Sequence, residues 1–198
     1  MLTGKKIVLG VSGGIAAYKM ANVASMLSKL HADIHVVMTE NATHFITPET
    51  FEVLTGNHCY TDTFDRCMEL HVPHIALGTQ ADAILIAPAS ADVVGKIANG
   101  IADDMLTTCV LPATCPVMLA PSMNVHMYEN PIVQDNMKKL ASYGYEIIEA
   151  DEGYLACRDI GKGKLPPEHV LVDYIIRACA MDKDLAGKKV LVLSLIHI

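Results

Sequence analysis

The sequence predicts an α/β fold, a doubly wound parallel sheet with helices on both faces. Short aliphatic runs alternate with longer segments of helical periodicity, the pattern of parallel strands joined by crossover helices. Residues 6–11 form a near-continuous apolar run, which is typical of a strand buried on both faces. The 198 residues are 52% hydrophobic, so they can build one domain with a sizeable core but not a second complete domain.

The first half of the chain contains two predicted strand–helix units. The strand over residues 6–11 precedes a helix whose apolar positions recur at helical spacing, namely Met20, Val23, Ala24 and Leu27. A second strand is predicted over residues 34–38. The helix that follows has Thr47 as its N-cap and Pro48 at its first position, and continues through residues 51–54.

The second half continues the alternation. Its expected elements are a strand over residues 82–87, helices over 91–99 and 104–110, a strand over 117–120, a helix over 131–142 and a short strand over 145–148. Ser90 and Asn130 are suited to cap the helices that they precede, and Gly144 marks the end of the last one. This order is that of flavodoxin-like and Rossmann-like sheets.

Charge and hydropathy limit the classes of ligand and the cellular location that we expect. The chain has 15 basic and 22 acidic residues, a net charge of −7, which argues against a nucleic-acid groove and favours small ligands. No apolar run approaches the roughly 18 residues that span a bilayer, and residues 1–6 lead into a strand without a signal-peptide core. We therefore expect a cytoplasmic protein with no membrane contact.

The cysteines and histidines do not predict a metal site. The six cysteines include no Cys-x-x-Cys pair, so we expect reduced thiols. His71 and His74 form His-x-x-His, but no third ligand accompanies them at a sensible spacing.

Small and polar residues follow all four main strands. They occupy residues 12–14, 39–41, 88–90 and 121–124. Because open α/β sheets bind ligands outside the carboxyl ends of their strands, these segments predict a nucleotide-like cofactor site. The Ser12-Gly13-Gly14 turn can present backbone N–H groups to a phosphate, although a tight turn without ligand fits it equally well. It is neither Gly-x-Gly-x-x-Gly nor a Walker loop, which disfavours dinucleotides and ATP.

Cys157 stands apart from the other cysteines. It lies in a polar, glycine-bearing segment with Arg158, Lys162 and Lys164 close in sequence. A reactive thiol needs partial exposure and nearby positive charge, whereas a structural cysteine is buried among apolar neighbours. Local sequence alone leaves both interpretations open.

Five motifs in order resemble the flavin-containing cysteine decarboxylases over nearly the whole chain. They are residues 10–19 (GVSGGIAAYK), the His74-Ile75 step before a helix, and residues 88–91 (PASA), 121–128 (PSMNVHMY) and 156–163 (ACRDIGKG). The chain departs from the family pattern at Asp92-Val93, where Asn-Thr is frequent, at Arg158, where Gly is usual, and at Lys164-Leu165, where Arg-Met is common.

The resemblance implies an activity and a set of catalytic residues. It implies FMN-dependent decarboxylation of 4'-phosphopantothenoyl-cysteine to 4'-phosphopantetheine in coenzyme A biosynthesis, through a thioaldehyde and an enethiolate. In this scheme Cys157 protonates the enethiolate, His74 acts as base or orienting group, and Asn124 binds the substrate carboxylate or amide. From the residues alone, a structural role is favoured for His74, because a lone histidine is more often structural, and Asn124 is equally suited to cap the loop after the strand.

The resemblance also implies the residues around the ligands. The expected cofactor-binding residues are Ser12, Gly13, Gly14, Ile15, Thr39, Ser90, Ala91 and Ala120, with Thr39 at the phosphate. Asn124, Met127 and Lys164 are the expected substrate-binding residues. Thr39 and Ser90 are also suited to simple capping roles.

The last residues predict a second domain. Residues 185–192 repeat the pattern of residues 2–9, so we expect a decarboxylase domain over 1–180 and, over 181–198, a linker with the truncated start of a ligase-like domain. The ending 194–198 does not resemble the glycine-rich loop that should follow. The family further implies a homo-oligomer, a trimer-based dodecamer with active sites between subunits.

Three alternatives share the architecture. A flavin prenyltransferase would have the opening loop but lack the motifs at 121–128 and 156–163. A non-catalytic flavin-binding regulatory subunit would have lost the cysteine or the histidine. A flavodoxin-like electron carrier is disfavoured, because the chain has no Trp and no Thr-x-Thr-Gly-type phosphate loop.

Overall fold

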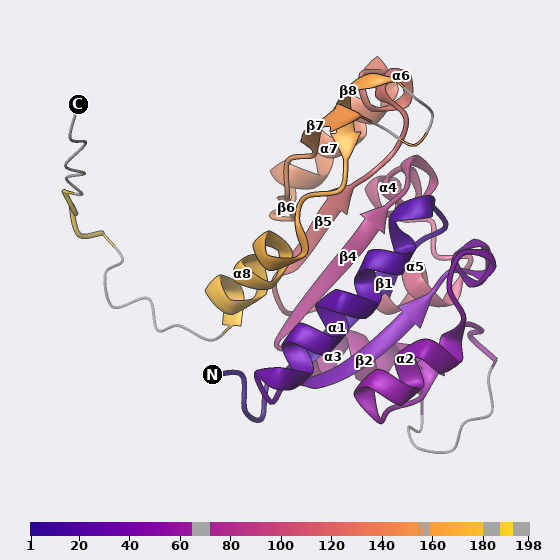
Figure 1. Ribbon diagram of the computed structural model, residues 1–198, viewed down its shortest axis with the longest axis vertical. Coiled ribbons are helices and arrows are strands. Elements are labelled where there is room, and N and C mark those ends of the chain that lie inside the picture. The colour runs from indigo at the N-terminus through magenta and orange to yellow at the C-terminus, as the bar shows by residue number, and fades with distance from the viewer. Residues whose placement is uncertain (65–71, 155, 157–158, 180–186, 192–198) are drawn as a thin grey trace.

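The computed structural model describes residues 1–64, 72–154, 156, 159–179 and 187–191. Its centre is a six-stranded sheet of order β3-β2-β1-β4-β5-β6 in which every neighbouring pair is parallel (Figure 1). The strands are β1 (Lys6–Val11), β2 (Asp33–Met38), β3 (Cys59–Tyr60), β4 (Ala83–Ala89), β5 (Val117–Pro121) and β6 (Glu146–Ile147). The predicted doubly wound parallel sheet is confirmed.

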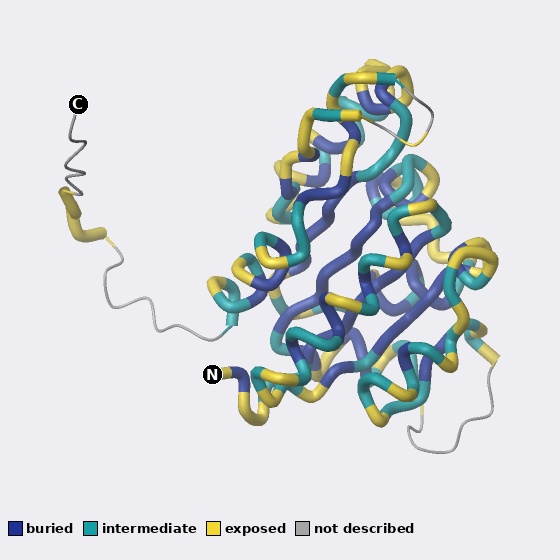
Figure 2. The backbone as a smooth tube through the Cα atoms, viewed as in Figure 1, coloured by how far each residue is buried: buried dark blue, intermediate teal, exposed yellow. Residues whose placement is uncertain are grey.

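Helices cover both faces of this sheet. One face carries α1 (Lys19–Lys29), α2 (Pro48–Thr55) and α8 (Glu168–Cys179), and the other carries α3 (Pro73–Gln80), α4 (Ala91–Ala98), α5 (Met105–Val110) and α7 (Pro131–Ser142). Along β1, Ile7 and Leu9 pack into the first layer while Val8 packs into the second, because successive strand side chains point to opposite faces. Figure 2 shows the central strands buried almost throughout.

Short elements shape the carboxyl edge of the sheet. They are the 3-10 helices η1 (Ile15–Tyr18) and η2 (Glu40–His44), the single turn α6 (Val125–Tyr128), and an antiparallel hairpin of β7 (Asp151–Tyr154) and β8 (Ile160–Lys164). The hairpin lies beside α6, at the end of the sheet toward which β4 and β5 point (Figure 1). Cys157 falls between these two strands in the sequence but lies outside the described residues.

Local sequence explains several boundaries. Ser90 is the N-cap of α4 and accepts a hydrogen bond from the Val93 backbone N–H at 3.3 Å, as predicted. Asn130 caps α7 in the same way through the Ile132 N–H at 2.9 Å. The α2 helix ends at Gly56, whose φ of +75° is the left-handed conformation that glycine adopts most readily.

The structure contains elements that the sequence expectations did not include, namely β3, the two strands of the β7–β8 hairpin and α8. The His74-Ile75 step was expected before a helix, and this is wrong, because Pro73 occupies the first position of α3 and places both residues inside its first turn. The linker at residues 182–184 and the ending at 194–198 lie outside the described residues.

The strand order reverses between β1 and β4, and one hydroxyl joins their ends. The Ser12 Oγ donates a hydrogen bond to the Pro88 carbonyl at 2.6 Å and accepts one from the Ser90 N–H at 2.9 Å. Such a switch point is where open α/β sheets form their ligand crevice. Of the helices described, none is both long and apolar enough to cross a membrane.

Candidate functional site

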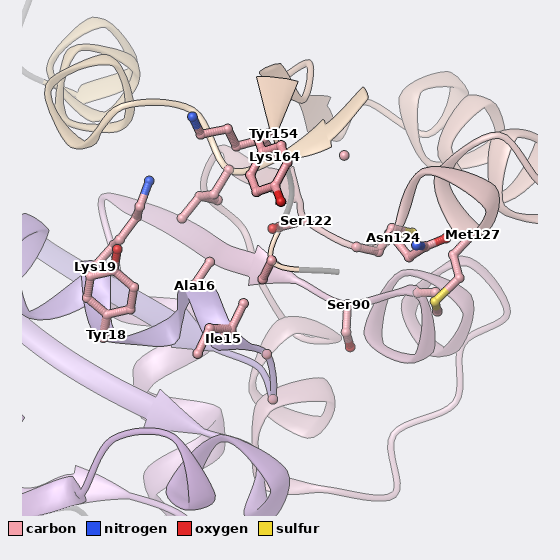
Figure 3. Close-up of a pocket in the computed structure, with 17 residues that line it drawn as sticks. Ile15, Ala16, Tyr18, Lys19, Ser90, Ser122, Asn124, Met127, Tyr154 and Lys164 are labelled. Atoms are coloured by element: carbon pink, nitrogen blue, oxygen red, sulfur yellow. The ribbon is translucent and has the colours of Figure 1, made fainter. Parts of the chain in front are cut away.

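A cleft of about 460 Å³ opens over the carboxyl ends of β1, β4 and β5 (Figure 3). Its walls come from the loop after β1, the start of α4, the loop after β5 and the hairpin. The lining residues are Gly13, Gly14, Ile15, Ala16, Tyr18, Lys19, Ser90, Ala91, Ser122, Met123, Asn124, Met127, Tyr154, Ala156, Gly163, Lys164 and Leu165. Four separate motifs of the sequence therefore meet around one cavity.

Two glycines seat the hairpin on the loop after β5. A Cβ at Gly161 would lie 2.6 Å from a methyl of Val125, and one at Gly163 would lie 2.3 Å from the Met123 carbonyl oxygen. The same approach allows the Met123 N–H to donate to the Gly163 carbonyl at 3.0 Å. Because any side chain at Gly163 would block this contact, the Gly-x-Gly spacing of the cysteine motif has a packing cause.

Asn124 and Asp159 connect the two most distinctive motifs. The Asn124 Nδ2 donates to Asp159 Oδ2 at 2.9 Å, and the Asn124 Oδ1 accepts from the His126 N–H at 2.8 Å as the N-cap of α6. The cap and the bond to Asp159 together fix the amide plane at the cleft. Capping and ligand binding are therefore compatible roles for Asn124.

A second cavity of about 420 Å³ adjoins the first and shares Gly13, Ser90, Ala91 and Met127 with it. It extends to Thr39, which caps η2 by accepting a hydrogen bond from the Ala42 N–H at 3.3 Å. The two cavities together follow the carboxyl ends of β1, β2 and β4.

The second cavity is acidic and contains one ammonium group. Lys96 Nζ lies 3.0 Å from Asp103, 3.3 Å from Asp104 and 3.4 Å from Asp92. The hydrogen bond to Asp103, with the charges of Asp92 and Asp104, raises the pKa of Lys96 and keeps it protonated. Asp92, which departs from the family pattern, is therefore paired within its own helix, with an ammonium group that it shares with two other aspartates.

The structure separates the expected cofactor residues into three groups. Gly13, Gly14, Ile15, Ser90 and Ala91 line the main cleft, and Thr39 lines the second cavity. Ser12 and Ala120 line neither, and both are 0% exposed. The Ser12 hydroxyl is engaged between β1 and β4, and the Ala120 methyl is in the core, so neither side chain offers a surface to a ligand.

The expected substrate residues lie together, and of the expected catalytic residues that the structure describes, Asn124 lines the main cleft and His74 does not. Asn124, Met127 and Lys164 all line the main cleft. His74 lines neither cavity, and its buried Nδ1 has no hydrogen-bond partner in the part of the chain that the structure describes. Cys157 and Arg158 lie outside the described residues.

Several lining residues had no predicted role, namely Ala16, Tyr18, Lys19, Ser122, Met123, Tyr154 and Leu165. Tyr18 and Lys19 end the opening motif, so their position was within reach of sequence reasoning. Tyr154 belongs to a strand whose sequence, Asp-Glu-Gly-Tyr, carries no apolar alternation. Only the fold brings it to the cleft.

The buried thiols contrast with a reactive cysteine. Burial raises the pKa of both Cys59 and Cys109 to about 12, so both remain protonated at neutral pH and behave as small hydrophobes. Among the residues with described placement, no group of three or more His, Cys, Asp or Glu side chains is arranged to hold a metal ion. His71, of the His-x-x-His pair, lies outside them.

Comparisons of sequence identify relatives over most of the chain. The profile of the flavoprotein family matches residues 1–180. A coenzyme A biosynthesis bifunctional protein CoaBC from Bacillus subtilis is 49% identical over 172 residues, which are 86% of this chain and 42% of that protein. The protein of the same name from Borreliella burgdorferi is 42% identical over 188 residues, which are 95% of this chain and 48% of that protein. The chain thus spans about half the length of the curated relatives it matches.

Solved structures agree with this fold. A PPC decarboxylase with a Cys-to-Ser substitution, in complex with pantothenoylaminoethenethiol, matches with a TM-score of 0.77 and 29% identity, covering 86% of this chain and 96% of that one. The FMN-dependent cysteine decarboxylase SpaF matches with a TM-score of 0.77 and 35% identity, and the match covers 90% of this chain and 99% of that one.

Proposed function

The chain belongs to the flavoprotein family, and from that premise we propose that it binds FMN and decarboxylates 4'-phosphopantothenoyl-cysteine to 4'-phosphopantetheine in coenzyme A biosynthesis. The names of its relatives, which combine coenzyme A biosynthesis with cysteine decarboxylation, support this reaction. The observation that carries the proposal is the 2.9 Å hydrogen bond from Asn124 to Asp159. It joins the loop after β5 to Asp159 of the cysteine motif at one cleft.

The residues at the carboxyl edge fit a flavin. Gly14 lines the main cleft, and a Cβ there would meet no atom within 4 Å, so the space above it is open to a ligand. Ser90 and Ala91 border both cavities, which allows one extended cofactor to contact the first loop, α4 and Thr39 together. We assign the FMN to these residues, with its phosphate toward Thr39.

The proposed chemistry divides between cofactor and protein. FMN supplies the electron sink, accepting a hydride from the cysteinyl carbon and later returning it. Asn124, held by Asp159 and by its own cap, orients the substrate carboxylate for loss of carbon dioxide. Cys157 then donates a proton to the enethiolate, which requires a thiol that is protonated but near cationic groups.

The first test is direct turnover. The protein is loaded with FMN and given 4'-phosphopantothenoyl-cysteine without oxygen, and the product is identified by mass spectrometry. Loss of carbon dioxide to give 4'-phosphopantetheine supports the proposal. A yellow protein that leaves the substrate unchanged would contradict it and favour a flavin prenyltransferase or a regulatory flavin-binding subunit.

The Cys157 assignment has its own test. Cys157→Ser keeps the size of the side chain but removes the titratable thiol, so oxidation and decarboxylation should continue while the final reduction stops. Mass spectrometry should then detect the oxidised, decarboxylated enethiol. Unaltered formation of 4'-phosphopantetheine would refute the role of Cys157.

His74 supports a proposal about assembly. Within one protomer His74 lies outside both cavities, and its buried Nδ1 has no partner among the described groups. An oligomer in which α3 of one protomer meets the cleft of the next would complete the site, as the trimer-based dodecamer implied by the family requires. We propose this arrangement and the base or orienting role of His74 within it.

Mixed oligomers test this arrangement. His74→Asn and Asn124→Ala proteins should each retain flavin and lack decarboxylation. When the two variants are co-expressed, about a quarter of the wild-type activity should return. Each site needs an intact His74 from one protomer and an intact Asn124 from its neighbour, and random assembly of the two variants brings these together at about one interface in four. Native mass spectrometry confirms mixing. No recovery in mixed oligomers would make His74 a residue of its own protomer, and a colourless His74→Asn protein would make it structural.

The remaining length of the curated relatives bears on the full protein. Because the chain spans about half of them, we propose that a ligase-like domain follows residues 1–180 in the complete protein. This proposal follows the bifunctional names of the relatives rather than any contact in the fold. The cytoplasmic location stays a prediction from the sequence.

A further inference from the structure

We propose that Lys19 and Lys164 form a phosphate-binding end of the main cleft, which recognises the phosphate monoester of the substrate and makes it a condition for tight binding. The inference rests on the proposed function and assigns the recognition of the substrate to particular residues. It names the feature that separates a phosphorylated cysteine derivative from a cysteine at the end of a peptide.

The two lysines approach the cleft from different elements. Lys19 begins α1 and Lys164 ends β8, and both line the same cavity. In Figure 3 their ammonium groups lie on the same side of the cleft, whereas Asn124 and Met127 lie toward its opposite side. A ligand held by its carboxylate at Asn124 would extend toward the lysines. Tyr18 and Tyr154, both more than half exposed, line the same cleft.

The charge of this end is not neutralised by the protein. In the described parts of the chain the ammonium groups of Lys19 and Lys164 have no hydrogen-bond or ion-pair partner, and no carboxylate is among the described residues that line the cleft. By contrast, the nearby Lys162 pairs with Glu149, and Lys96 is surrounded by three aspartates. In a protein of net charge −7, a cavity with two lysines and no acid attracts an anion.

The position of the two lysines, rather than their charge, favours the substrate phosphate over that of the flavin, since both ligands carry a phosphate monoester. Such a group has about −1.5 to −2 charges at neutral pH and accepts several hydrogen bonds, so it gains from two ammonium groups. The flavin phosphate is assigned to Thr39, which lines the second cavity and not this one. The lysine end therefore remains for the substrate.

Paired ligands test the assignment. Calorimetric titration of the FMN-loaded protein compares 4'-phosphopantetheine with pantetheine, which lacks the phosphate. We expect the wild type to bind the phosphorylated ligand about 10- to 100-fold more tightly, as expected for hydrogen bonds between charged groups. Lys19→Met and Lys164→Met should each reduce the preference, and the double variant should abolish it. Lys19→Arg should retain most of it.

Two lysines on the same elements provide controls. Lys29→Met at the other end of α1 and Lys162→Met on β8 remove the same charge without touching the cleft, so both should keep the preference. Equal loss in these controls would show a non-specific effect of net charge and would overturn the inference.

The cofactor and the function are tested separately. FMN and riboflavin affinities, measured by flavin fluorescence quenching, should be unchanged in the lysine variants. If the lysine variants bound FMN more weakly but riboflavin as tightly as the wild type, the lysines would hold the cofactor phosphate. That result would overturn the inference. The inference would also be overturned if the wild type bound and turned over phosphorylated and unphosphorylated substrates equally well. The decarboxylase proposal would then stand. If neither substrate is decarboxylated, the proposed function fails, and the binding preference still decides whether the lysines read a phosphate.

Discussion

The two edges of the parallel sheet satisfy their polar groups in different ways. At the amino edge, Asp82 accepts hydrogen bonds from the Lys6 N–H at 2.8 Å and from the Lys5 ammonium at 3.0 Å. At the carboxyl edge, the ammonium groups of Lys19 and Lys164 line a cleft and have no hydrogen-bond or ion-pair partner within the described part of the chain. The charge of Asp82 is therefore satisfied by the chain itself, whereas the charges of these two lysines are left for a ligand to satisfy.

The electrostatics at the amino edge agree with this contrast. Burial alone would raise the pKa of Asp82, but the hydrogen bonds from Lys6 and Lys5 outweigh it and hold the pKa below its ordinary value. The carboxylate is thus stabilised by groups of the same chain. An equivalent stabilisation of Lys19 and Lys164 would have to come from an anion.

Gly163→Ala should have the largest effect, because it separates the hairpin from the cleft. The new Cβ would lie 2.3 Å from the Met123 carbonyl oxygen, at a φ of +138° that an L-residue rarely adopts. The hairpin strand that carries Lys164 must then shift. Misplacement of this order lowers turnover about 100-fold, which kcat/KM for decarboxylation would measure.

Gly144→Ala is the matched control for this change. Gly144 also has a positive φ, +93°, but a Cβ there meets no atom within 4 Å, and it lies beyond the end of α7. It should reduce stability slightly and leave turnover unchanged. If Gly163→Ala is as active as Gly144→Ala, the hairpin does not need its close seat on the loop after β5.

Ser12→Ala should have the next largest effect, because it opens the carboxyl edge between β1 and β4. The buried hydroxyl is the acceptor for the Ser90 N–H, which would lose its hydrogen bond. An unsatisfied buried donor costs about 1–3 kcal/mol, so we expect a loss of about 2 kcal/mol in the free energy of unfolding. Urea denaturation of the FMN-loaded protein at one protein concentration measures it.

Ser142→Ala separates this effect from the loss of any hydroxyl. The Ser142 Oγ donates to the Lys139 carbonyl at 2.7 Å on the exposed side of α7. Water replaces that bond, so the variant should change stability by no more than about 0.5 kcal/mol. Equal losses in the two variants would show that the Ser12 bridge contributes nothing special to the junction of β1 and β4.

The strands that form the sheet could be predicted because their apolar runs are long. Residues 6–11 and 34–38 were placed to within one residue, and the caps at Ser90 and Asn130 were correct. The β7–β8 hairpin was not predictable, since Gly161 and Gly163 interrupt a strand whose pairing depends on tertiary contact. The two-residue strand β3 was too short to have a periodicity.

The site was predictable as a set of motifs but not as a set of distances. The rule on strand ends correctly placed Gly13, Ser90 and Asn124 around one cleft. It could not tell that Ser12, adjacent to Gly13, is enclosed between two strands. Neighbouring side chains at the end of a strand point in opposite directions, and the sequence does not say which of them faces the cavity. Nor could it separate the paired Lys162 from the unpaired Lys164, which differ only in what the fold places opposite them.

Asp82→Asn addresses the amino edge and should have the smallest effect. It removes the charge that Lys5 and the Lys6 N–H stabilise, and for a pair that is partly exposed we expect a loss of about 1 kcal/mol at neutral pH. Turnover should not change, because the site is at the other edge. Asp135→Asn is the control, since the Asp135–Lys138 pair is about three-quarters exposed and should contribute little.

The pH dependence gives the sharper form of this prediction. The folded-state pKa of Asp82 is lowered from 3.8, so its stabilising contribution is present above that value and is lost as the pH falls through the folded pKa. Wild type and Asp82→Asn should therefore differ by a constant amount near pH 7 and converge in urea titrations below pH 3.8. A difference that persists in acid would show that the amide disturbs the packing of β1 against β4, and the amino edge would then owe its stability to shape rather than to completed polar contacts.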